Sequence, residues 1–143
     1  MHLTRFTDNA LRCLIYLGQN PDRVVTVGEV SRKMGMSEDH LLKVVRRLVT
    51  LGHVRTIRGR SGGLRLNRAA SEIVVGEVVR ATEDNLALVP CFQPGNDRCP
   101  LTPNCDLADS LDEALGAFFG VLQKVTLADL VTPGVERRAS GVG

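Results

Sequence analysis

The segment TVGEVSRKMGMSEDHLLKVVRRLVTLG, residues 26–52, decides the fold. Glu29 follows Thr26 at the spacing of a capping box, which predicts a short helix that begins near Thr26 and stops at Gly35. Ser37 is placed to cap a second helix over residues 38–51. Apolar residues at helical spacing predict its buried stripe, Leu41, Val44, Val45, Leu48 and Val49. Two helices joined by a tight turn predict a helix-turn-helix.

The stretch HVRTIRGRSGGLRLNR, residues 53–68, predicts a two-stranded hairpin. Val54 and Thr56 alternate on one strand, and Leu64 and Leu66 alternate on the other, with a glycine-rich loop between them. A hairpin directly after a helix-turn-helix gives a winged helix. With an amphipathic helix over residues 4–18, we therefore expect residues 1–68 to form a winged-helix DNA-binding region.

The second half of the chain predicts a connector, a loop and a long helix. Residues 69–89 connect the winged helix to a loop at 90–106 that holds four Pro, one Gly and two Asn. Residues 107–131 contain a helix and a short end, followed by a tail at 132–143 that we expect to be disordered. The helix has an apolar seam near the coiled-coil period, formed by Leu107, Leu111, Leu115, Phe118, Leu122 and Val125. The predicted fold class is mainly α, a winged helix-turn-helix with a two-stranded wing and a long C-terminal dimerisation helix.

The composition narrows the class of protein. The 143 residues are 43% hydrophobic and 24% charged, as in ordinary globular domains. No apolar run approaches the ~20 residues of a membrane span, and the polar start does not resemble a secretory signal, so we expect a cytoplasmic protein. A Ser/His/Asp grouping, a phosphate loop and an HExxH motif are all missing from the sequence, which argues against an enzyme.

A basic front half predicts binding to double-stranded DNA. Residues 1–68 carry 13 Lys/Arg against 5 Asp/Glu, whereas residues 69–143 carry 5 against 11. A solvated charged face is the plainer interpretation, but the acid-free basic run at 43–68 coincides with both the second helix and the wing. One helix face would enter a major groove, and the wing arginines would contact the backbone or minor groove. The predicted DNA contacts are Ser37, His40, Lys43, Arg47, Arg58, Arg60, Ser61 and Gly62.

Three of the four cysteines lie within 15 residues, at Cys91, Cys99 and Cys105. Thiolates are soft ligands for zinc, copper(I) and iron–sulfur clusters. The loop lacks the close cysteine pairs and the fourth ligand of structural zinc, so the pattern favours an iron–sulfur cluster. A zinc-stabilised DNA-binding protein and a cluster-free thiol switch remain open. Cys13 lies among apolar helix residues and is predicted to be a buried hydrophobe.

Several segments resemble the family of iron–sulfur winged-helix repressors of the NsrR, IscR and RirA types. They are LTRFTDNALR at 3–12, RGRSGGLRL at 58–66, the three cysteines before the long helix, and TLADLV at 126–131. The start and the cysteine pattern resemble most the nitric-oxide-sensing NsrR type. The His that the IscR type places after the third cysteine is missing from residues 106–113. The segments at 82–92 and 114–123 also resemble the iron-responsive RirA type, which tends to carry Asn where this chain has Asp8.

The resemblance implies a homodimer on a palindromic operator, with nitric oxide as the effector or, as the alternative, iron. It implies a 2Fe–2S or 4Fe–4S cluster held by Cys91, Cys99, Cys105 and Asp8 of the partner subunit. Taken by itself, Asp8 would instead cap the first helix. Arg12 lies one turn after Asp8 and would pair with it in the absence of a cluster.

Overall fold

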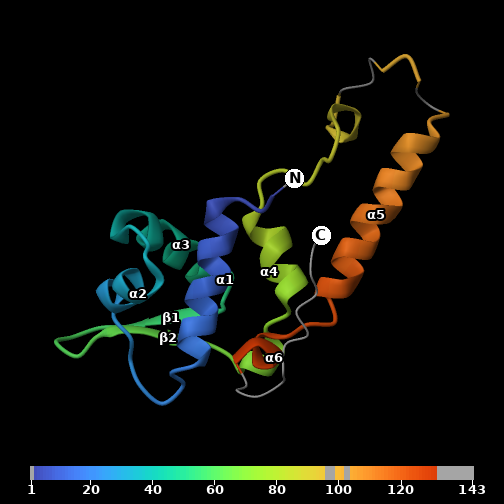
Figure 1. The fold of residues 1–143 in the computed structure, drawn as a ribbon. Helices are drawn as coiled ribbons and strands as arrows, with labels where there is room; N and C mark the ends of the chain where they lie inside the picture. Colours follow the sequence, from blue (N-terminus) through green and yellow to red (C-terminus); the bar gives the residue numbers. More distant parts are fainter. Residues whose placement is uncertain (1, 96–98, 102–103, 132–143) are drawn as a thin grey trace.

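The computed structural model describes residues 2–95, 99–101 and 104–131 (Figure 1). In chain order the elements are α1 (Arg5–Gly18), α2 (Val27–Met34), α3 (Glu38–Thr50), β1 (Val54–Ile57), β2 (Gly63–Leu66), a 3₁₀ turn (Ala70–Glu72), α4 (Val75–Thr82), a second 3₁₀ turn (Pro90–Phe92), α5 (Asp106–Leu122) and α6 (Leu127–Val131). The two strands pair antiparallel. The predicted fold class is therefore confirmed, while the tail at 132–143 lies outside the described residues.

The helix-turn-helix begins and turns where its sequence predicts. Thr26 Oγ1 accepts a hydrogen bond from the Glu29 N–H at 3.2 Å, and Gly35 ends α2 in the left-handed conformation at φ 66°. The Glu29 carboxylate accepts from Tyr16 and Arg23 rather than from Thr26, so only half of the capping box forms. Ser37 occupies the N-cap of α3 but makes no side-chain capping bond, which corrects the capping role expected for it.

α1 lies at the centre of the body and packs against α2, α3, α4 and α6. Its buried face and those of α2, α3 and the hairpin form one core. Val49 was expected in this core but is 39% exposed. At 100° per residue, Val49 lies about 80° around α3 from Leu41, beyond the edge of the buried stripe.

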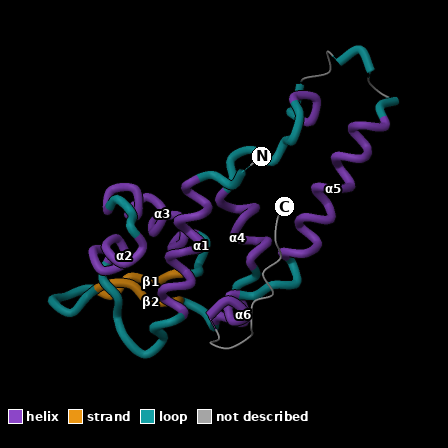
Figure 2. Tube along the Cα trace, viewed as in Figure 1, coloured by secondary structure: helices purple, strands orange, loops and turns teal. Residues whose placement is uncertain are grey.

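The hairpin lies beside this body as the wing (Figure 2). Val54 pairs with Leu66, and Thr56 pairs with Leu64, so the two alternating patterns meet in register. Val25, just before α2, exchanges two backbone hydrogen bonds with Leu64 at 3.0 and 2.7 Å. These bonds attach the wing to the helix-turn-helix.

α5 extends away from the body, with α4 between it and α1 (Figure 1). Phe119 is buried against Val75 and Val79 of α4. In the predicted apolar seam, Leu107 is 63% exposed and Phe118 is 37% exposed, whereas the other four residues are partly buried. Val121, which lies outside the predicted seam, is also 63% exposed. Within the described residues, no helix has the length and apolar character needed to cross a membrane.

Candidate functional site

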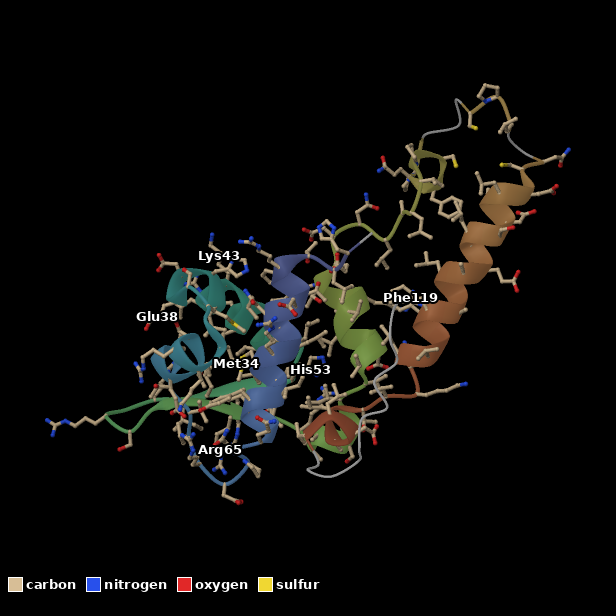
Figure 3. The ribbon with its side chains drawn as sticks, viewed as in Figure 1. Met34, Glu38, Lys43, His53, Arg65 and Phe119 are labelled. Carbon is tan, nitrogen blue, oxygen red and sulfur yellow. The ribbon has the colours of Figure 1, made fainter. Side chains whose placement is uncertain are left out.

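Most predicted DNA contacts lie on α3 and on the tip of the wing. Lys43 is exposed on α3 (Figure 3), and Ser37 is exposed at its N-terminus. Arg58, Arg60 and Ser61 are exposed in the β1–β2 turn. These side chains combine positive charge with hydroxyl donors, which suits the phosphate backbone of DNA.

Gly62 has a steric reason to be glycine, independent of any contact with DNA. Its N–H donates to the Gly59 carbonyl at 3.0 Å inside the turn. A Cβ at Gly62 would lie 2.4 Å from the Ile57 carbonyl oxygen. The wing therefore needs a glycine here to close its turn.

His40 is only partly exposed, because its ring packs against α1. The ring meets Phe6 edge-on, with centroids 6.0 Å apart. Its Nε2 is enclosed and has no hydrogen-bond partner in the described part of the chain. His40 also lines a cavity of about 390 Å³ between α1 and the helix-turn-helix, together with Arg5, Asp8 and Ser37. A candidate cluster ligand and the start of α3 thus share one cavity.

Arg47 is directed to another helix rather than left free on α3. Its Nε and Nη2 donate to the Ala81 carbonyl at 3.1 and 2.8 Å, at the C-terminal end of α4. Helical spacing alone groups Arg47 with His40 and Lys43, and it contains no signal that α4 ends beside α3. Sequence reasoning therefore missed this contact.

The three clustered cysteines are all free and partly exposed. Cys91 lies in the second 3₁₀ turn, and Cys105 is the N-cap residue of α5, where its sulfur makes no capping bond. Cys99 lies in the loop between them. Across residues 2–95, 99–101 and 104–131, no three His, Cys, Asp or Glu side chains are close enough to bind one metal ion. The chain brings the cysteines to one loop without assembling a coordination shell.

The donor set fits an iron–sulfur cluster in its chemistry. Three unpaired, accessible thiols on one irregular loop are the ligands that such clusters use, and they leave one position for a ligand from elsewhere. Cys13 is excluded as that ligand, because it is fully buried in α1 and burial raises its pKa to about 12.

Asp8 is available on the surface of α1. The cap of α1 is Thr4, whose Oγ1 accepts from the Thr7 N–H at 3.2 Å, so the capping role considered for Asp8 is wrong. The Asp8 carboxylate instead pairs with Arg12 Nε at 3.0 Å, with half of each side chain exposed. This is the pair expected in the absence of a cluster.

Fold and surface define a winged-helix DNA-binding protein, and the family that the chain matches consists of transcriptional regulators rather than enzymes. The chain belongs to the Rrf2 family, described as iron-dependent transcriptional regulators, which it matches over residues 3–133.

The chain is similar to regulators from several bacteria. It is 47% identical over 141 residues to the HTH-type transcriptional regulator NsrR of Geobacillus kaustophilus, covering 98% of this chain and 93% of that protein. It is 45% identical over 131 residues to protein aau3 of Rhizobium meliloti, covering 92% and 85%. Among solved structures, T. potens IscR superposes with a TM-score of 0.72 at 22% identity, covering 92% of this chain and 86% of that one. The structural likeness confirms the winged-helix fold.

Proposed function

We propose that this protein is a nitric-oxide-sensing repressor that binds a palindromic operator as a homodimer, with an operator affinity controlled by an iron–sulfur cluster. The observation that carries this proposal is the loop of three free, accessible cysteines between α4 and α5. It occurs in a chain 47% identical to a regulator named NsrR.

The DNA-binding step uses α3 and the wing of each protomer. Lys43 and Ser37 would contact the major-groove side, and Arg58, Arg60 and Ser61 would contact the backbone or minor groove. The acidic second half of the chain supports this orientation, because it repels the phosphates that the basic half attracts.

The uncovered face of α5 supports the homodimer. Leu107, Phe118 and Val121 are exposed on a helix that buries only Phe119 within its own chain. Pairing two α5 helices about a two-fold axis would bury these side chains and would present two α3 helices to the two halves of a palindrome.

Cys91, Cys99 and Cys105 would hold the cluster, with Asp8 of the partner subunit as the oxygen ligand. When bound, the cluster supplies thiolate-ligated iron that reacts with nitric oxide. Within one chain, Asp8 pairs with Arg12 across an exposed i, i+4 contact, which is worth about 0.3–0.5 kcal/mol. Asp8 can therefore exchange this partner for another at small cost.

An anaerobic titration with nitric oxide tests the proposal, following the visible absorption and operator binding of the purified protein together. Loss of the chromophore together with release of DNA at stoichiometric nitric oxide is the expected result. Cys99→Ala should abolish the chromophore, whereas Cys13→Ala, a buried thiol outside the loop, should retain it. A colourless protein that contains zinc, or a metal-free protein whose DNA binding responds to thiol oxidants, would replace the proposal with one of those alternatives.

An iron-responsive repressor is the second candidate, because the family is described as iron-dependent. Its site residues would be the same, and only the signal differs. DNA release on iron depletion, with nitric oxide leaving operator binding intact, would establish this candidate in place of the first.

A further inference from the structure

Residues 80–83 comprise the last residues of α4 and its C-cap, Glu83. We call this segment the junction turn. The last carbonyls of a helix have no N–H partner within it, and they attract positive charge. Arg47 of α3 satisfies this requirement, since two of its N–H groups donate to the Ala81 carbonyl at 3.1 and 2.8 Å. The guanidinium of Arg47 thus ties α3 to the end of α4.

The junction turn also holds the start of α1. Glu83 Oε1 accepts from the Thr4 N–H at 2.8 Å and from Thr4 Oγ1 at 3.1 Å. Burial raises the pKa of Glu83, but hydrogen bonds from Thr7 and Thr4 lower it more, so the carboxylate is favoured. Thr4 is the N-cap of α1, the helix that carries Asp8. The position of Asp8 is therefore tied to the end of α4.

A third contact joins the junction turn to α5. The Arg80 guanidinium lies over the Phe119 ring, 3.7 Å from its centroid. Phe119 is the buried residue of α5, so this contact lies where α5 meets the body. Three helices from different parts of the chain, α1, α3 and α5, thus contact the junction turn.

The cysteine loop is connected to this turn directly at one end and through α5 at the other. The chain runs from Glu83 to Cys91 in eight residues, and α5 starts directly after Cys105. The junction turn therefore offers a route by which a rearrangement of the loop could reach α3 and α1.

We propose that Arg47 and Glu83 are positioning residues that set the orientation of α3 and α1 relative to the cysteine loop. In this role Arg47 does not contact DNA, in contrast to the prediction from helical spacing. The inference rests on the proposed function, since it takes α3 as the helix that binds the operator and the loop as the regulated element.

The test compares two single-charge deletions on α3 in the full-length protein, purified anaerobically. Arg47→Met replaces the guanidinium by an unbranched apolar side chain and so removes both donors to Ala81. Lys43→Met removes one charge from an exposed position. Fluorescence anisotropy measures the affinity for operator and for unrelated DNA over a range of salt concentrations. Thermal unfolding checks that both variants are folded.

Arg47→Met should weaken operator binding about tenfold, a factor that corresponds to 1.4 kcal/mol. Its affinity for unrelated DNA and its salt slope should stay as in the wild type. Lys43→Met should instead weaken binding to both DNAs and lower the salt slope by about 0.9 per protomer, as expected for a lost phosphate contact. A residue that only positions α3 should therefore lose operator specificity when it is replaced, while the salt dependence of DNA binding stays unchanged.

The inference is overturned if Arg47→Met lowers the salt slope as Lys43→Met does, which would make Arg47 a phosphate contact. It is also overturned if Arg47→Met binds operator as tightly as the wild type does. If Arg47→Met does not fold, Glu83→Met gives the decision for the second positioning residue, since it removes the oxygen that accepts both hydrogen bonds from Thr4. Unchanged operator specificity in Glu83→Met would refute the positioning role. A wild-type protein that does not bind operator would refute the proposed function itself.

Discussion

Replacing Asp8 with alanine should separate a ligand role from a role in the fold. The lost ion pair with Arg12 is half-exposed, so it is worth about 0.3–0.5 kcal/mol. A first-turn carboxylate adds about 0.3–1 kcal/mol through the helix dipole, and the better helix propensity of Ala returns up to about 0.7 kcal/mol. The net loss of stability should stay below about 1 kcal/mol, which shifts Tm by no more than about 4 °C.

The cluster should respond much more strongly than the fold. Loss of the chromophore in an anaerobic chelator assay should be at least about tenfold faster in Asp8→Ala, because even the outer partners of metal ligands change affinity by that factor. Arg12→Ala is the matched control, since it breaks the same ion pair and leaves the carboxylate in place. Equal rates of chromophore loss in Asp8→Ala and the wild type would refute the ligand role. Equal acceleration in both variants would attribute the effect to the ion pair.

Three further predictions concern thiols, pH and the wing. In the cluster-free native protein, a thiol reagent should label three cysteines quickly and Cys13 only after unfolding, because Cys13 is 0% exposed and has a pKa of about 12. Rapid labelling of all four cysteines would contradict the buried position of Cys13. Burial, and then the charge of Arg68, lower the pKa of His53, so the unfolded chain binds more protons and stability should fall as pH drops below about 6.5. Urea unfolding of His53→Gln should show a flatter pH dependence than the wild type over that range. Arg60→Ala should weaken operator binding and lower its salt slope, and unchanged affinity in anisotropy would remove the wing contact.

The helix-turn-helix and wing could be predicted because local residues determine them. Thr26 caps α2 and Gly35 ends it with a positive φ, and both effects act within one turn of the chain. The alternation of Val54 with Thr56 and of Leu64 with Leu66 likewise contains the register of the hairpin. The helix ends and the hairpin register depend on residues that are close together in the chain, so the spacing of those residues is enough to predict them.

The site was less predictable, because its contacts join distant parts of the chain. Arg47 and Ala81 are 34 residues apart, and Thr4 and Glu83 are 79 apart. A basic residue on the polar side of a helix has the same spacing whether it contacts solvent, DNA or the end of another helix. Tertiary packing decides between these, as it also decides that the Glu29 carboxylate pairs with Arg23 instead of completing its capping box.

The Asp8–Arg12 ion pair and the Arg47–Ala81 hydrogen bonds differ in strength. This difference suits them to different parts in the proposed regulation. The Asp8–Arg12 pair is worth a few tenths of a kcal/mol, so it can form or break without opposing the exchange of a ligand. The Arg47–Ala81 contact is charge-assisted and exposed, worth about 1.5 kcal/mol at the lower end of its range. The tenfold weakening of operator binding expected for Arg47→Met corresponds to 1.4 kcal/mol, which is about the same size. A thousandfold release in the proposed switch would need about 4 kcal/mol, so the ligand set that we propose is shared between subunits would have to supply most of it.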